Sequence, residues 1–283
     1  VGASASDTLD GNLTDSVTIV STVNTDAVGS YSVTYSVSDA NGNAAEVTRT
    51  VSVVDTTKPV ITLLGNVTET LEAKGTYTDE GASASDTLDG SLTVTSVSTV
   101  NTNAVGSYTV TYSVSDANGN AAANVIRTVS VVDTTKPVIT LLGSATETLE
   151  AKSVYKDAGV SASDTLDGSL TVTSVSTVNA DTVGSYSVTY SVSDANGNAA
   201  VSVVRTVNVV DTVPPLISLI GDINVTVEAG GVYLDKGVSV VDALDGDLGD
   251  KLVVTNTVNT LKPGSYTVKY NAIDSHGNLA SEV

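Results

Sequence analysis

Residues 108–120 read YTVTYSVSDANGN, and this stretch determines the predicted fold. Tyr and Val alternate with Thr and Ser over its first eight positions, which is the two-residue period of a strand with one buried face. The dipeptide Asn118-Gly119 favours a tight hairpin turn, because Asn and Gly tolerate the positive φ that such turns require. The stretch therefore predicts a half-buried β-strand that leads into a hairpin.

The stretch is repeated along the chain, with near-copies at residues 31–43 and 186–198 and a variant at 266–278. Residues 81–122 and 159–200 differ at only five of 42 positions. The linker motif Val-Val-Asp-Thr recurs 78 residues apart, with its Asp at Asp55, Asp133 and Asp211. A period of this size is typical of an array of small domains.

We therefore expect four modules and refer to them as the first to fourth. The first and fourth are incomplete, because the sequence starts and stops inside a repeat, and we expect a segment of a longer array. Near-copies in series favour a role that depends on length or multivalency, not an enzyme with one good site. The expected boundaries are 1–54 (the C-terminal part of a module), 55–132, 133–210, and 211–283 (last strand truncated).

The second module reads as a series of short strands separated by turn residues. About seven short strands in fewer than 80 residues are typical of an immunoglobulin-like β-sandwich. The predicted fold class is therefore all-β, a tandem array of immunoglobulin-like β-sandwich modules in single file. The expected extended segments are 59–64, 67–73, 77–83, 92–100, 108–115 and 121–132.

The composition limits the function classes. The 283 residues carry 32 acidic and 12 basic side chains, a net charge of −20. This excludes a nucleic-acid partner, which needs a basic face, and disfavours anionic membrane surfaces, so we expect no direct membrane insertion of this chain. The chain has no Cys, Phe, Trp or Met. Because a domain this small is marginally stable on its core alone, we expect a metal ion to support it.

The acidic motifs suggest where a metal would bind. In an immunoglobulin-like sandwich, the loops 86–90 and 116–120 lie at the same end as the incoming linker 55–58. Several carboxylates in one small volume repel one another, and Ca²⁺ accepts six to eight oxygen ligands of this kind. We therefore predict Ca²⁺ at the junctions between modules. The predicted ligands are Asp55, Asp86, Asp89, Asp116 and Asn118, then Asp133, Asp164, Asp167, Asp194 and Asn196, then Asp211, Asp242, Asp245 and Asp274, with His276 at the Asn position.

Simpler interpretations exist for each motif. Asn-Gly and Asp-Gly are ordinary turn dipeptides, so either loop alone needs no ligand. Asp79 is a weaker alternative ligand, and Asp157 and Asp235 are its counterparts in the next two modules. His276 is the only His of the chain, so a Ser-His-Asp arrangement is not available in the second and third modules. We predict no enzyme activity.

A family resemblance follows from the order of these motifs. The stretches DTTKPVITLLG, YTDEG, DTLDG, GSYTVTY and DANGN resemble, in this order, the tandem immunoglobulin-like repeats of large bacterial surface proteins, including hyaline-repeat-like and crystal-toxin types. The resemblance implies an extracellular or cell-surface location and a stalk or spacer role in an adhesin or fibre. Its partners would be neighbouring modules of the same chain, a homopolymer or a cell-surface molecule. Two alternatives are a self-assembling filament or surface-layer subunit and a glycan-binding adhesive module that uses exposed Tyr side chains.

Overall fold

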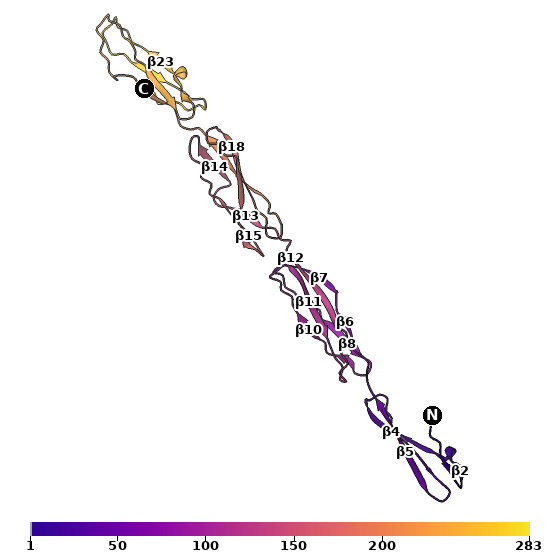
Figure 1. Cartoon of the computed structure of the whole chain (residues 1–283). Coiled ribbons are helices and arrows are strands. Elements are labelled where there is room, and N and C mark those ends of the chain that lie inside the picture. The colour runs from indigo at the N-terminus through magenta and orange to yellow at the C-terminus, as the bar shows by residue number, and fades with distance from the viewer. Residues whose placement is uncertain (1) are drawn as a thin grey trace. The chain divides into compact units, whose positions relative to one another are not determined.

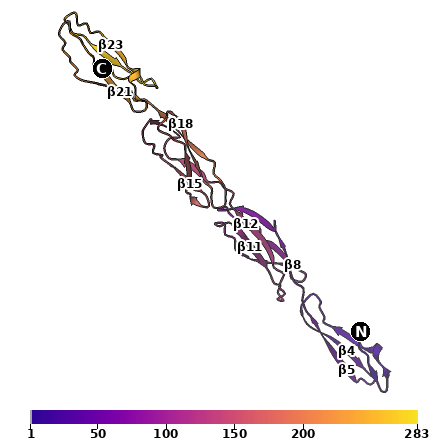
Figure 2. The ribbon, with the colours of Figure 1, turned by 45° about the horizontal axis from the view of Figure 1, so that its top comes forward.

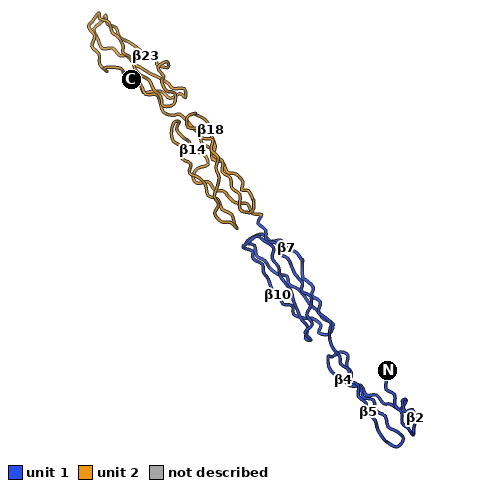
Figure 3. Tube along the Cα trace, in the orientation of Figure 1, with its two compact units in different colours: residues 1–133 blue, residues 134–283 orange. Residues whose placement is uncertain are grey.

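The computed structural model describes residues 2–283, which fold into strands, turns and loops. Two single-turn 3-10 segments, η1 (Thr14–Ser16) and η2 (Gly249–Lys251), are the helical elements of this range. None of these residues lies in a helix long and apolar enough to cross a membrane. The chain divides into two compact units, Val1–Asp133 and Thr134–Val283, coloured separately in Figure 3.

The first unit begins with two small sheets. Strands β1 and β2 form one, and β3, β4 and β5 form the other in that order. The β4–β5 hairpin is long, with antiparallel pairing from Gly29↔Val53 to Ser38↔Ala44. The strands are β1 (Ser6–Asp7), β2 (Gly11–Asn12), β3 (Thr18–Ser21), β4 (Gly29–Ser38) and β5 (Ala44–Val53).

The rest of the first unit is a sandwich of two sheets (Figure 1). One sheet has the order β6-β8-β9, and the other has the order β10-β11-β12-β7, in which β12 and β7 run parallel. Figure 2 shows β11 and β12 side by side in a second view. The strands are β6 (Val60–Leu63), β7 (Thr68–Glu72), β8 (Ala82–Asp86), β9 (Gly90–Leu92), β10 (Thr95–Ser98), β11 (Gly106–Ser113) and β12 (Val125–Val132).

Alternating side chains of both sheets fill the core of this sandwich. Val110 and Tyr112 of β11 pack with Ile61 of β6 and Ala84 of β8. The sequence pattern thus has the expected effect, with one face of β11 buried and its Thr and Ser residues on the other face. Tyr108 lies nearer the edge, where its hydroxyl donates to the backbone oxygen of Ala104 at 2.9 Å.

The second unit repeats this pattern. Its first sandwich has the sheets β13-β15-β16 and β14-β19-β18-β17, and its second part has β20-β21-β22 and the pair β23-β24. The strands are β13 (Val138–Leu141), β14 (Thr146–Glu150), β15 (Val160–Asp164), β16 (Gly168–Ser169), β17 (Thr173–Ser176), β18 (Gly184–Ser191), β19 (Val203–Val210), β20 (Leu216–Leu219), β21 (Val238–Asp242), β22 (Gly246–Asp247), β23 (Val253–Asn256) and β24 (Val268–Asn271).

Three predicted segments differ from the observed strands. The segment predicted at 77–83 becomes a strand only from Ala82, because Asp79 is held by side-chain hydrogen bonds. The segment predicted at 92–100 contains the last residue of β9, Leu92, and the whole of β10, and these two strands belong to different sheets. The last segment begins as a strand at Val125, not Ala121, although Ala121 forms an isolated bridge with Ser115.

Candidate metal centres

The first loop of the candidate centre follows strand β8 in the second module. The strand ends at Asp86, whose Oδ1 accepts the backbone N–H groups of Leu88 at 2.8 Å and Asp89 at 3.3 Å. Gly90 supplies the positive φ of 71° that closes this turn. The other oxygen, Asp86 Oδ2, is buried and has no hydrogen-bond partner. Asp86 thus shapes its turn with one oxygen and leaves the other uncompensated.

The second loop follows strand β11 and is organised by Asp116. Its Oδ1 accepts the N–H groups of Asn118 at 2.9 Å and Asn120 at 2.7 Å, and its Oδ2 accepts the Asn120 side-chain amide at 2.7 Å. Burial of Asp116 favours the neutral acid, but the hydrogen bonds from Asn120 outweigh it and hold the pKa below its usual range. Asp116 therefore stays ionised and fixes the loop.

The two loops meet the linker that contains Asp55. The N–H of Ala117 donates to Asp89 Oδ2 at 3.0 Å, and the Asn118 amide donates to Asp55 Oδ2 at 3.1 Å. The carboxylates of Asp55, Asp86 and Asp89 each place one oxygen within 4.8 Å of the others. We call these three residues the aspartate cluster of the second module. Asp116, which is also a predicted ligand, lies in the adjoining loop and is not a member of this cluster.

The third module has the same two loops. Asp164 and Asp194 are both buried, and Asp164 Oδ2 also lacks a hydrogen-bond partner. Asp167 Oδ2 accepts the N–H of Ala195 at 2.9 Å, and Asp194 Oδ1 accepts the N–H of Asn196 at 3.0 Å. Asp133, the remaining predicted ligand, is buried at the end of the first unit.

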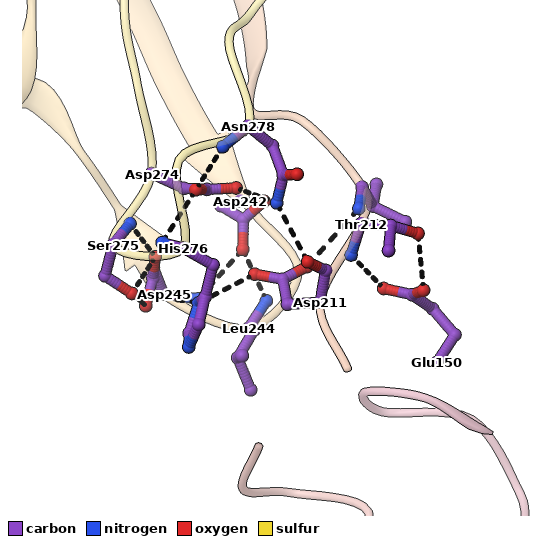
Figure 4. Close-up of polar contacts among 11 residues, drawn as sticks. Glu150, Asp211, Thr212, Asp242, Leu244, Asp245, Asp274, Ser275, His276 and Asn278 are labelled. Atoms are coloured by element: carbon purple, nitrogen blue, oxygen red, sulfur yellow. Dashed lines mark hydrogen bonds and ion pairs between the residues drawn. The ribbon is translucent and has the colours of Figure 1, made fainter. Parts of the chain in front are cut away.

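The fourth module brings four groups together (Figure 4). Asp211, Asp245, Asp274 and His276 each offer one ligand atom within 4.8 Å of the others. Burial raises the pKa of Asp211, and the nearby carboxylates of Asp242 and Asp274 add to this effect. Hydrogen bonds from the backbone and hydroxyl of Ser275 lower the pKa of Asp245. Asp242 is buried beside them, and its Oδ2 has no hydrogen-bond partner.

The sequence reasoning missed a second ionic cluster, centred on a buried arginine. Arg127 points inward from β12, is 0% exposed, and forms ion pairs with Asp79 and Glu69. Its Nε donates to the backbone oxygen of Asn66 at 2.9 Å. The sequence did contain a sign of this burial. Arg127 occupies an inward position in the alternating series Val125, Arg127, Val129 and Val131.

The same cluster accounts for Asp79, the alternative ligand. Its Oδ1 accepts hydrogen bonds from Arg127 and from the Tyr112 hydroxyl. Burial opposes the charged form of Asp79, but these bonds lower its pKa. In the third module Arg205 likewise pairs with Glu147 at 2.6 Å and Asp157 at 3.4 Å. Asp79 and Asp157 therefore belong to the arginine clusters.

A comparison with protein families agrees with the repeat. Residues 1–53, 61–131, 139–209 and 217–283 each match the family described as bacterial surface protein, Ig-like domain. The chain belongs to this bacterial surface Ig-like family. The predicted fold class, an all-β tandem array of Ig-like modules, is thereby confirmed. Since this is a family of bacterial surface proteins, the location of the Ig-like array is extracellular or at the cell surface.

Comparisons with individual proteins add little to the family assignment of the Ig-like array. No curated protein sequence matches it. Among solved structures, a lipoprotein of Bacteroides thetaiotaomicron matches with 15% identity and a TM-score of 0.25, over 52% of this chain and 79% of its own. Protocadherin gammaB7 EC3-6 matches with 12% identity and a TM-score of 0.32 over 91% and 85%, and human CDH23 EC21-23 with 17% and 0.27 over 74% and 87%. With scores this low, these three structures decide neither the function nor the metal content of the chain.

Proposed function

We propose that this Ig-like array is a non-enzymatic stalk or spacer of a bacterial surface adhesin or fibre, and that Ca²⁺ binds where successive modules join. The proposed modules are residues 1–54, 55–132, 133–210 and 211–283. Membership in a surface family and the near-identity of successive modules support a role that depends on length. The calcium part of the proposal depends on the geometry of the aspartate clusters.

The observation that carries the proposal is the buried, unpartnered Oδ2 of Asp86. Asp86 is only 8% exposed, and the carboxylates of Asp55 and Asp89 lie within 4.8 Å of it. Two like charges about 4 Å apart at an effective dielectric of about 20 repel by roughly 4 kcal/mol. A buried oxygen without a donor adds a desolvation cost. A bound cation would remove both penalties.

The donor chemistry favours Ca²⁺ among divalent cations. The second-module cluster offers the carboxylate oxygens of Asp55, Asp86 and Asp89, the Asn118 amide lies beside Asp55, and the chain contains no Cys. Ca²⁺ accepts six to eight such oxygens in an adaptable geometry, whereas Mg²⁺ demands a near-ideal octahedron and retains water. Rotation of the Asn118 amide would turn its oxygen toward Asp55 and complete the predicted set. Asp116 would support the loop.

The linker within the second unit forms hydrogen bonds on both of its sides. The N–H and hydroxyl of Thr212 donate to the carboxylate of Glu150 at 2.8 and 2.7 Å (Figure 4). On its other side, the backbone oxygen of Asp211 accepts the Asn278 amide at 3.1 Å. The linker is thus bonded to the module before it and to the module after it. A cation bound to Asp211 would strengthen the second attachment.

Calorimetric titration of the full chain with Ca²⁺ tests the binding. We expect saturable binding, with one site fewer in the variant Asp86→Asn and no change in the variant Asp26→Asn, which alters an exposed Asp outside the clusters. The absence of binding up to several millimolar Ca²⁺ would refute the proposal.

Small-angle scattering with Ca²⁺ and then with chelator tests the stiffening. An unchanged maximum dimension of the chain would refute the stiffening and leave the proposed Ca²⁺ binding in place.

A further inference from the structure

The fourth module differs from the second and third at one position of its candidate centre. His276 occupies the place of Asn118 and Asn196. The loop backbone is unchanged by the replacement, because the N–H of His276 donates to Asp274 Oδ1 at 2.9 Å, as the N–H of Asn118 does to Asp116 Oδ1. The fourth module therefore presents an imidazole where the other modules present an amide.

The imidazole faces carboxylates. His276 Nδ1 lies 3.1 Å from Asp211 Oδ2, and Asp245 and Asp274 complete a set of four groups whose ligand atoms fall within 4.8 Å of one another (Figure 4). The His276 side chain is 32% exposed, so an ion has a path from solvent. The Asp211 side chain, by contrast, is only 3% exposed.

A second observation points to a ligand at the same place. Asp242 is 4% exposed, and its Oδ1 accepts the N–H groups of Leu244 at 2.7 Å and Asp245 at 2.9 Å. Its Oδ2 is buried without any hydrogen-bond partner. Figure 4 shows this carboxylate beside Asp211 and Asp274. An uncompensated buried oxygen of this kind calls for a positive group that the protein itself does not supply.

We propose that the fourth-module centre, made of Asp211, Asp245, Asp274 and His276 with the buried Asp242 beside them, binds a divalent transition-metal ion of the Zn²⁺ class in preference to Ca²⁺. This inference goes beyond the proposed function and does not depend on it, because it concerns a different ion at one centre. It holds even if the oxygen-only centre of the second module binds no calcium.

Ligand chemistry decides the preference. Imidazole nitrogen is a favoured ligand of Zn²⁺, Cu²⁺ and Ni²⁺, whereas Ca²⁺ is bound by oxygen ligands. A tetrahedral Zn²⁺ with bonds of about 2.0–2.1 Å holds its ligand atoms roughly 3.4 Å apart. His276 Nδ1 and Asp211 Oδ2 are already 3.1 Å apart, and the four ligand atoms of Asp211, Asp245, Asp274 and His276 all lie within 4.8 Å of one another. The four groups therefore suit one small ion with a mixed nitrogen and oxygen donor set.

The test is a Zn²⁺ titration of the full chain in excess Ca²⁺, comparing the wild type with His276→Asn. This variant restores the residue found in the second and third modules, so the loop should fold normally. We expect Zn²⁺ affinity at one site to fall at least about tenfold, since even outer-shell changes cost 10–100-fold. The control is Asp26→Asn, which alters an exposed carboxylate outside the fourth module and leaves His276 and the carboxylates around it unchanged. It should bind Zn²⁺ within a few-fold of the wild type.

A second readout uses the fact that His276 is the only His in the chain. Its imidazole resonances in an NMR spectrum are therefore unambiguous, and we expect them to shift with one equivalent of Zn²⁺. Equal Zn²⁺ affinity in the wild type and His276→Asn would overturn the proposal, as would imidazole resonances that Zn²⁺ leaves unmoved. Either result would leave Ca²⁺ binding by the second module, measured separately, unaffected.

Discussion

The second module contains two clusters of charged side chains that differ in how their charge is balanced. In the arginine cluster, the guanidinium of Arg127 is fully buried, pairs with the carboxylates of Asp79 and Glu69, and donates to backbone oxygen. Asp79 also accepts a hydrogen bond from the Tyr112 hydroxyl. In the aspartate cluster, Asp55, Asp86 and Asp89 come together without a basic side chain among them, and Asp86 Oδ2 lacks a partner. Burial of charge is costly unless it is paired. The charge of the first cluster is therefore balanced within the protein, whereas the second keeps an uncompensated buried oxygen, which is where we propose that a cation binds.

The buried Arg127 also forms part of the core of this small module. Tyr112 is almost fully buried, and its ring lies 5.8 Å from the Arg127 guanidinium carbon. Arg127 thus fills core space with its methylene groups while its head ties together backbone from the loops around Leu64 and Asn66. In a chain without Phe, Trp, Met or Cys, this cluster takes the place of a large aromatic or a disulfide at the centre of the sandwich.

Removal of the arginine should have the largest effect. Arg127→Ala removes the buried cation that pairs with Asp79 and Glu69 and leaves the backbone oxygen of Asn66 without this donor, so we expect the second module to lose about 3–5 kcal/mol of unfolding free energy. Native-state hydrogen exchange of β12 measures the loss, and β19 of the third module is the internal control because it retains Arg205. A loss below about 1 kcal/mol would show that the arginine cluster is dispensable.

Removal of one carboxylate from the aspartate cluster should lower the unfolding free energy only when calcium is present. At Ca²⁺ concentrations about 100 times the dissociation constant, bound Ca²⁺ would add about 2.7 kcal/mol of stability. We expect Asp86→Asn to abolish this increment in the second module and to leave the metal-free stability unchanged or slightly higher, because a like charge is removed. Hydrogen exchange with and without Ca²⁺ measures both quantities. A loss of metal-free stability comparable to that of Arg127→Ala would contradict the comparison.

The two clusters also differ in how far the sequence predicts them. The acidic loops could be placed together from the sandwich topology, since their motifs are local and mark strand ends. The arginine cluster could not, because Arg is normally exposed and two of its acceptors, the backbone oxygens of Leu64 and Asn66, have no sequence signature. The same contacts shift the start of β8, since Asp79 is drawn toward Arg127. Binding of an ion to the aspartate cluster remains a prediction.

A smaller effect should come from the Tyr112 hydroxyl. Tyr112→Phe removes one hydrogen bond to the charged Asp79 and keeps the ring, so we expect a loss of about 1.5–2 kcal/mol. Tyr108→Phe is the matched control, because the Tyr108 hydroxyl donates to a neutral backbone oxygen in a half-buried position. It should cost only about 0.5–1 kcal/mol. Equal losses in the two variants would argue against a special role for Asp79.

The arginine clusters should also determine the response to acid, with no effect near neutral pH. The pKa values of Asp79 and Asp157 are lowered, against the effect of burial, by hydrogen bonds from Tyr112 and Tyr190 and by the nearby arginines. A lowered folded-state pKa means that these carboxylates contribute stability above the unfolded value of about 3.9. That stability is lost as the pH falls through the lower folded value. Chemical denaturation of the wild type and of Asp79→Asn between pH 7 and pH 2 measures this effect. We expect the unfolding free energy of both proteins to stay constant down to about pH 4. Below that pH the wild type should lose stability more steeply, because only the wild type must protonate Asp79 beside Arg127. A parallel acid loss in both proteins would mean that other carboxylates control the transition.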